Sequence, residues 1–195
     1  MIQKKSKHNI YMKCNNSFSQ ISIPNGVKIE KKKDFLIFSG VLGLTKVEYT
    51  KIDPTGIGGI HLSKDEKTLI IFSESKPFKA SLITLLKNKI RGVSVGFLVS
   101  LRIVGVGYRA SLEKKFSKTF LHFKLGYSHN LKYQLPESIR AFLLEPSLLC
   151  LFGVDKNQVS QLGSKIRNFK PPERYKGKGI RFTNEKVALS QGKRK

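Results

Sequence analysis

The sequence predicts an α+β fold of two related small domains, each an antiparallel sheet packed against a helix, with a basic C-terminal extension. Hydrophobic and polar residues alternate over most of the chain, which is typical of strands, while two segments repeat hydrophobic residues at helical spacing. Residues 23–27 (IPNGV) are echoed by residues 135–139 (LPESI). In both copies a proline precedes a strand and a later glycine, Gly40 or Gly153, ends a second strand, as in a hairpin. Each half of the chain contains one copy of this pattern and one predicted helix, which indicates that the two halves are related domains.

These patterns divide the chain into four parts. They are a basic arm (1–20), a first α+β domain (21–97), a second α+β domain (98–169) and a basic extension (170–195). The arm contains no acidic residue and no apolar secretory core, so it fits either a weak transit segment or, more simply, a disordered arm.

Pairs and triplets of hydrophobic residues two positions apart predict the strands. They are Val27/Ile29, Phe35/Ile37, Val47/Tyr49, Ile103 to Tyr108, Phe120 to Leu125, Ile139/Ala141/Leu143 and Leu149/Leu151. Glycine, proline, asparagine or serine bounds each of these runs, as expected for strands joined by turns.

The first helix is predicted over residues 77–90. Pro77 suits the first helical turn, and Gly92 is a plausible C-terminal stop. One apolar stripe runs along this segment: Leu82, Leu85, Leu86 and Ile90.

The second helix is predicted to begin at Asp155. Asp155 and Gln158 have the spacing of a capping box, and Pro171 with Pro172 prevents the helix from continuing. Its apolar stripe consists of Val159, Leu162, Ile166 and Phe169.

The charge balance indicates a polyanionic partner. Lys and Arg number 37 against 13 Asp and Glu, a formal net charge of +24. Self-repulsion at this charge opposes compaction, so nucleic acid and an anionic membrane surface are the two candidate partners. With 39% hydrophobic residues the chain is too apolar for a disordered basic tail. Its most apolar stretch, residues 139–154, contains two charged residues and a proline, so no membrane span is expected.

Catalytic, cofactor and metal sites are not indicated. Cys14 and Cys150 lie far apart without a disulfide or zinc pattern, which favours a reducing compartment. Residues 105–110 fit G-x-G-x-x-A, but the acidic residue that a dinucleotide fold needs about 20 positions later is missing. We therefore expect no cofactor, no metal and no enzyme activity, and we interpret these glycines as a bulge or close approach in a twisted strand.

The C-terminal stretch from Pro171 to Phe182 is the most informative part of the chain. Its prolines prevent a helix, and its glycines let the backbone pass close to another chain. Cations that contact phosphate alternate with rings that stack on bases. The candidate RNA-binding residues here are Lys170, Arg174, Tyr175, Lys176, Lys178 and Arg181. The alternative is a disordered tail neutralised nonspecifically, but the interleaved rings favour an ordered, docked extension.

Three further candidates lie upstream. Arg109 follows two glycines and can reach a phosphate from there. Ser128 and His129 lie in a polar turn within an acid-free run from Lys114 to Lys132, a composition that suits sugar-phosphate contacts.

Several motifs resemble one known family. Residues 172–180 (PERYKGKGI) are similar to the signature of large-subunit ribosomal protein six, of bacterial and organellar type. Residues 104–110 (VGVGYRA), 125–129 (LGYSH), 134–136 (QLP) and 153–158 (GVDKNQ) also resemble that family, in the same order. The first half resembles it less, since the family's Gly-Pro-x-Gly turn is replaced by residues 39–43 (SGVLG).

The resemblance implies a structural constituent of the large ribosomal subunit that supports translation. It implies binding to large-subunit rRNA near the stalk base and the sarcin–ricin loop, beside neighbouring ribosomal proteins and with translational GTPases nearby. It assigns rRNA contacts to Tyr175, Lys176, Lys178 and Arg181, and further contacts to Arg109, Ser128 and His129. The alternative function is a free RNA-binding regulator or chaperone that shares the fold.

The composition also bears on location. Lysine far outnumbers arginine, and isoleucine, phenylalanine and asparagine are abundant, as in proteins encoded by AT-rich genomes. With the divergent first half, this favours a mitochondrial ribosome, with a plastid or bacterial ribosome as the alternatives.

Overall fold

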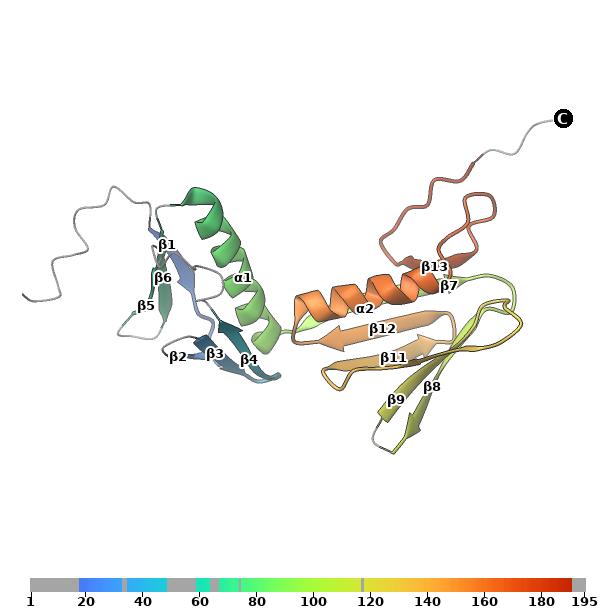
Figure 1. Ribbon diagram of the computed structural model, residues 1–195, viewed down its shortest axis with the longest axis horizontal. Coiled ribbons are helices and arrows are strands. Elements are labelled where there is room, and N and C mark those ends of the chain that lie inside the picture. Colours follow the sequence, from blue (N-terminus) through green and yellow to red (C-terminus); the bar gives the residue numbers. More distant parts are fainter. Residues whose placement is uncertain are drawn as a thin grey trace, which may run out of the picture.

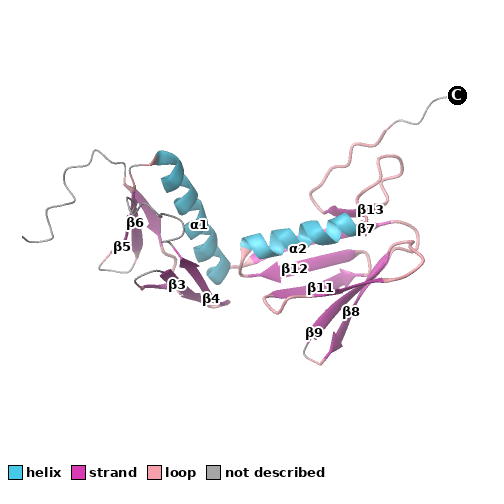
Figure 2. Ribbon diagram, viewed as in Figure 1, coloured by secondary structure: helices cyan, strands magenta, loops and turns pink. Residues whose placement is uncertain are grey.

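The computed structural model describes residues 18–32, 35–48, 59–63, 67–73, 75–116 and 118–190. These residues form two α+β units, which are joined where helix α1 (Lys76–Ser94) leads into strand β7 (Phe97–Val104) (Figure 1). Each unit combines antiparallel sheets with one helix (Figure 2), which confirms the predicted fold class. Most of the predicted arm, residues 1–17, and the last residues, 191–195, lie outside the described parts of the chain.

The first unit has two three-stranded sheets, in the strand orders β1-β6-β5 and β2-β3-β4. The strands are β1 (Ser19–Ser22), β2 (Lys28–Lys31), β3 (Phe35–Gly40), β4 (Gly43–Glu48), β5 (Gly59–Leu62) and β6 (Thr68–Phe72). Helix α1 buries Leu82, Leu86 and Ile90 against a core that includes Phe38 and Ile71. The predicted apolar stripe therefore does face the sheets.

The second unit has a four-stranded sheet, β11-β12-β7-β13, and a three-stranded sheet, β10-β9-β8. Its further elements are β8 (Arg109–Lys115), β9 (Lys118–Lys124), β10 (Leu131–Gln134), β11 (Ile139–Glu145), β12 (Leu148–Gly153), α2 (Lys156–Phe169) and β13 (Gly179–Phe182). One core joins both sheets to α2, because Leu121 and Phe123 of β9, Leu149 and Leu151 of β12 and Ile166 of α2 belong to the same buried cluster.

The internal echo corresponds to two equivalent hairpins. Strand β2 pairs with β3 after Pro24, and β11 pairs with β12 after Pro136, both antiparallel. Gly40 ends β3 and Gly153 ends β12, as predicted. Of the predicted first-half strands, only Tyr49 falls outside the described residues.

The first helix is longer than predicted and Gly92 does not end it. Helix α1 continues to Ser94, and Gly92 is buried inside it. A Cβ atom at position 92 would collide with the carbonyl oxygen of Val154, which belongs to the second unit. The glycine therefore allows a close approach between the two units and does not terminate the helix.

Two other local predictions are wrong. The capping box does not form: Asp155 precedes α2 without a side-chain cap hydrogen bond, and it pairs instead with Lys89 of α1 at 2.8 Å. Gln158 accepts a hydrogen bond from Ser138 at 2.8 Å. The strand predicted from Ile103 to Tyr108 ends at Val104, because Gly105 and Gly107 have positive φ angles and form a turn.

The fold of the second unit continues beyond residue 169, where the predicted second domain ends. Strand β13 pairs antiparallel with β7, and its Ile180 is fully buried in the core. Similarly, Ser19 and Gln20 of the predicted arm belong to β1, which pairs with β6. Among the helices of the described residues, none has the length and apolarity that a membrane crossing requires.

Candidate nucleic-acid interface

Three loops meet at the end of the second unit that lies far from α1, on the right in Figure 1. They are residues 105–108 between β7 and β8, residues 125–130 between β9 and β10, and residues 170–178 between α2 and β13. Tyr108 lies against Gly126, and Tyr127 contacts the last turn of α2, so the loops support one another.

The 170–178 loop is closed by backbone hydrogen bonds. The Ile180 N–H donates to the Lys170 carbonyl at 2.7 Å and closes its base. Inside the loop, the Glu173 N–H donates to the Lys178 carbonyl at 2.8 Å, and the Gly177 N–H to the Glu173 carbonyl at 3.0 Å. These bonds make an ordered turn with Arg174, Tyr175 and Lys176 at its tip, as expected if the extension is ordered.

The loop presents cations and a ring to solvent. Arg174 and Lys176 are exposed, Lys178 is half-buried, and 69% of the Tyr175 surface is accessible. Within the described residues, none of these three cations forms an ion pair with a carboxylate. A preorganised loop with unneutralised cations and an exposed ring suits phosphate contacts and base stacking.

A bidentate ion pair between Arg167 and Glu185 holds the segment after β13 against the last turn of α2. Arg167 donates through Nε to Glu185 at 2.9 Å and through its terminal nitrogen to the other carboxylate oxygen at 2.5 Å. Glu185 also accepts the Phe182 N–H at 3.2 Å. These hydrogen bonds hold the pKa of Glu185 below its usual value and raise the pKa of Arg167. Glu185 is thus engaged on the α2 side of the loop.

Lys170 connects this loop with the 125–130 turn. Its ammonium lies 4.4 Å from the centre of the Tyr127 ring, and the Tyr127 hydroxyl donates to the Phe169 carbonyl at 3.0 Å. Ser128 and His129 follow Tyr127 and are exposed. The structure therefore places the turn that contains Ser128 and His129 next to Lys170, at the base of the 170–178 loop.

Arg109 and Arg181 lie on strands, each directly opposite a second cation. Arg109 begins β8 and faces Lys124 of β9, while Arg181 on β13 faces Arg102 of β7. Like charges in directly opposed positions destabilise a sheet, so an anion bound there would relieve the repulsion. Sequence reasoning missed Arg102 and Lys124, because only the pairing of distant strands places them beside the candidates.

The glycine-containing turn at residues 105–108 joins two strands, β7 and β8. A dinucleotide-binding fingerprint requires a strand followed by a helix, so this connection does not fit one. In the described part of the chain, no three His, Cys, Asp or Glu residues gather as a metal site would need.

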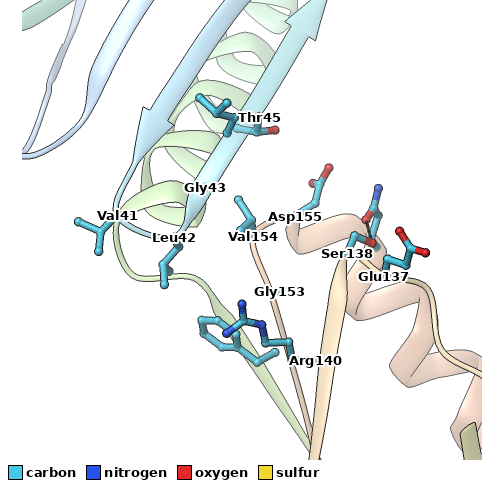
Figure 3. A pocket seen from close by; sticks show the side chains of 13 residues that line it. Val41, Leu42, Gly43, Thr45, Glu137, Ser138, Arg140, Gly153, Val154 and Asp155 are labelled. Carbon is cyan, nitrogen blue, oxygen red and sulfur yellow. Dashed lines mark hydrogen bonds between the residues drawn. The ribbon is translucent and has the colours of Figure 1, made fainter. Parts of the chain in front are cut away.

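A groove of about 470 Å³ lies between the two units. The β3–β4 turn supplies Leu42, and the second unit supplies Arg140 and Asp155 (Figure 3). Asp155 is engaged there by Lys89. With two carboxylates, Glu137 and Asp155, among its lining residues, the groove suits a polyanion less well than the loops do.

Comparisons with known proteins point to ribosomal proteins. A sequence model described as ribosomal protein L6 matches residues 104–183, which include every candidate residue. The large ribosomal subunit protein uL6m of Prototheca wickerhamii is 42% identical over 184 residues, covering 90% of this chain and 95% of the relative. The protein uL6 of Chloroherpeton thalassium is 34% identical over 178 residues, covering 89% and 93%. The protein uL6 of Xylella fastidiosa strain M12 is 36% identical over 178 residues, covering 89% and 95%.

Proposed function

The chain belongs to the ribosomal protein L6 family, as a structural constituent of the large ribosomal subunit, and from this premise we propose that its 170–178 loop is an rRNA contact. Ribosomal RNA and other ribosomal proteins are its partners, and it is not an enzyme. The observation that carries the proposal is an ordered loop whose three cations, Arg174, Lys176 and Lys178, have no carboxylate partner among the described residues.

The surrounding residues extend this contact. Lys170 lies at the base of the loop, Ser128 and His129 lie in the adjoining turn, and Tyr175 offers an exposed ring for stacking on an unpaired base. Arg109 and Arg181 add cations from the strands on which they lie. In this proposal the loop contacts phosphates through Arg174, Lys176 and Lys178, and the neighbouring polar side chains contact sugars and phosphates.

We further propose that the bound rRNA lies near the stalk base and the sarcin–ricin loop, with translational GTPases nearby. Three family-like motifs overlap the three adjoining loops of the second unit. They are residues 104–110, 125–129 and 172–180. Their proximity supports a single contact region for this rRNA.

We also propose a mitochondrial ribosome as the location. The similarity to uL6m of Prototheca wickerhamii, at 42% identity, supports this proposal together with the lysine-rich composition. Bacterial uL6 proteins at 34% and 36% identity keep a bacterial ribosome as an alternative, with a plastid ribosome as the other.

The test compares two triple variants of equal charge. Arg174→Ala/Lys176→Ala/Lys178→Ala removes the loop cations, whereas Lys28→Ala/Lys46→Ala/Lys67→Ala removes three exposed lysines of the first unit. Binding to an rRNA fragment that contains the stalk base and the sarcin–ricin loop is titrated across salt concentrations. Losing three phosphate contacts should flatten the slope of log K against log salt by about 2 to 3 units.

The control variant should change the slope much less than the loop variant. Equal effects of the two variants would show nonspecific neutralisation and would refute the loop contact. Co-sedimentation of the full chain with large subunits after a moderate salt wash separates a stable subunit protein from a free RNA-binding regulator, which the wash would remove.

A further inference from the structure

The three-stranded sheet of the second unit has one face in the core and one outer face. Ala110, Leu121 and Phe123 point into the core, so their sequence neighbours on each strand point outward. This outer face is defined by Arg109, Ser111, Glu113 and Lys115 of β8, Lys118, Phe120, His122 and Lys124 of β9, and Lys132 and Gln134 of β10. It carries five Lys or Arg residues and one carboxylate.

Cations oppose one another across this face. Arg109 is directly opposite Lys124, and Lys115 is directly opposite Lys118. Each such pair costs the sheet stability, since opposed like charges repel. Lys115 already has the Glu113 carboxylate beside it, so the repulsion left for a bound anion to relieve is that between Arg109 and Lys124, and the strand register favours an anionic occupant there.

The single carboxylate on the outer face is fully engaged. Glu113 pairs with Lys115 at 2.8 Å and with His122 at 2.7 Å. These contacts lower the pKa of Glu113, and the hydrogen bond with Lys115 has the largest effect. Among the described residues, no carboxylate forms an ion pair with Arg109, Lys118, Lys124 or Lys132.

An exposed aromatic ring stands at the β8–β9 turn beside the basic residues. Phe116 is 98% exposed and has a φ angle of +44°, a conformation that bulky residues rarely adopt. It directly follows Lys115. Neither burial in the core nor a backbone preference for positive φ explains a phenylalanine here, whereas stacking on a base would. Nearby, Lys132 lies 4.3 Å from the centre of the Phe120 ring.

We propose that the outer face of β8, β9 and β10, from Arg109 and Lys124 to Phe116, binds a single-stranded segment of rRNA. This deepens the rRNA-binding function proposed above and rests on it. Rows of the face repeat every two residues, about 6.8 Å along a strand, so a backbone that follows the strands meets Lys or Arg in three of the four rows, all but that of Glu113, Phe120 and Gln134. An unpaired base is required because only its face is available to stack on Phe116.

The face adjoins the loop contact at one end and adds separate residues at the other. Arg109 immediately follows the 105–108 turn, next to the loops, while Phe116 lies at the opposite end of β8. The bound RNA would therefore continue from the loop contact along the sheet. Lys118, Lys124, Lys132 and Phe116 lie outside the 170–178 loop, so they can be altered without changing it.

The test measures binding of the full chain to a fluorescent 12-nucleotide oligouridine and to a 12-base-pair RNA duplex. Phe116→Ala should weaken oligouridine binding about fivefold or more, since stacking contributes roughly 1–3 kcal/mol per base. Phe116→Tyr should restore the affinity, because it retains a stacking ring at the same backbone position. Phe18→Ala, which removes an exposed ring from the first unit, is the matched control and should change little.

A second experiment tests the lysines of the sheet. It compares the triple variant Lys118→Ala/Lys124→Ala/Lys132→Ala with the control variant Lys28→Ala/Lys46→Ala/Lys67→Ala. The sheet variant should flatten the salt slope for oligouridine by about 2 units, three contacts at about 0.7 each, and the control should not. Circular dichroism confirms folding. If the triple variant fails to fold, the Phe116→Ala and Phe116→Tyr pair decides the question alone.

Each outcome separates this inference from the loop proposal. Wild-type oligouridine affinity in Phe116→Ala, or equal salt slopes in the two lysine variants, overturns the sheet contact even where the Arg174/Lys176/Lys178 variant loses rRNA binding. Loss of oligouridine binding in the sheet variants, together with unchanged rRNA binding by the Arg174/Lys176/Lys178 variant, supports the sheet contact and refutes the loop contact. Tighter binding of the duplex than of oligouridine, with the same sensitivity to Phe116→Ala, would overturn the single-stranded assignment.

Discussion

Gly179→Ala tests how far the cationic loop depends on one close approach of backbone to backbone. Gly179 begins β13 with a φ angle of +137°. A Cβ atom at this position would lie 2.6 Å from the Pro171 carbonyl oxygen and 2.8 Å from the Lys170 carbonyl oxygen. These neighbours are backbone atoms, and Lys170 also accepts the Ile180 N–H that closes the loop, so relief of the collision must open the base of the loop.

Two costs add at position 179. An alanine held at this φ angle is strained by about 1–3 kcal/mol. The collision adds a cost like that of an overpacked core, about 1–3 kcal/mol, reduced to the extent that the loop opens. A total near 3 kcal/mol should lower the melting temperature by about 6–12 °C for a chain of this size.

Gly107→Ala is the matched control for this measurement. Gly107 also has a positive φ angle, +74°, but a Cβ atom there would have no neighbour within 4 Å. It therefore carries the strain without the collision. Thermal unfolding and rRNA titration of both variants isolate the contribution of the close approach. Equal melting temperatures for the two variants, with unchanged rRNA binding by Gly179→Ala, would refute the claim that the close backbone approach at Gly179 shapes the loop.

Two further predictions concern the contacts that hold the second unit in place. Because Arg167 lowers the pKa of Glu185, the pair contributes stability above the usual pKa of 4.5, and this contribution is lost as pH falls through the lower folded-state value. Glu185→Gln should therefore reduce the free energy of unfolding near pH 7 and flatten its decline in acid, and an unchanged profile in urea titrations would contradict this. Gly92→Ala should destabilise the chain, although alanine is favoured over glycine inside a helix by about 1 kcal/mol, because its Cβ would collide with the Val154 carbonyl. Small-angle scattering should show a changed distance between the units, and a more stable variant with the wild-type profile would show that no such contact exists.

The sequence predicted the elements whose signal is local. Both helices were found from stripes such as Leu82, Leu86 and Ile90, because a helix with one buried face must repeat apolar residues at its own period. The two hairpins were found because a proline before a strand and a glycine after one restrict the backbone wherever they occur. The loop at residues 170–178 was expected for a similar reason, since Pro171 and the glycines exclude a helix there.

The errors have long-range causes. Asp155 has the sequence of a helix cap, but Lys89, 66 positions away, takes its carboxylate. Gly92 has the sequence of a helix stop, but the backbone of Val154 requires a residue without a side chain at that position. Strand β13 was missed because its four residues contain a single core residue, Ile180, and pair with a strand far earlier in the chain.

The sequence by itself determined a basic α+β protein with a cation-rich segment near the C-terminus. Charge and hydrophobic period are properties of each segment and do not depend on what it packs against. Only the tertiary structure decided which cations face one another, as Arg181 does Arg102 and Arg109 does Lys124. The two-residue alternation of a strand shows which residues share a face, but the register between strands is set by core packing across the whole unit.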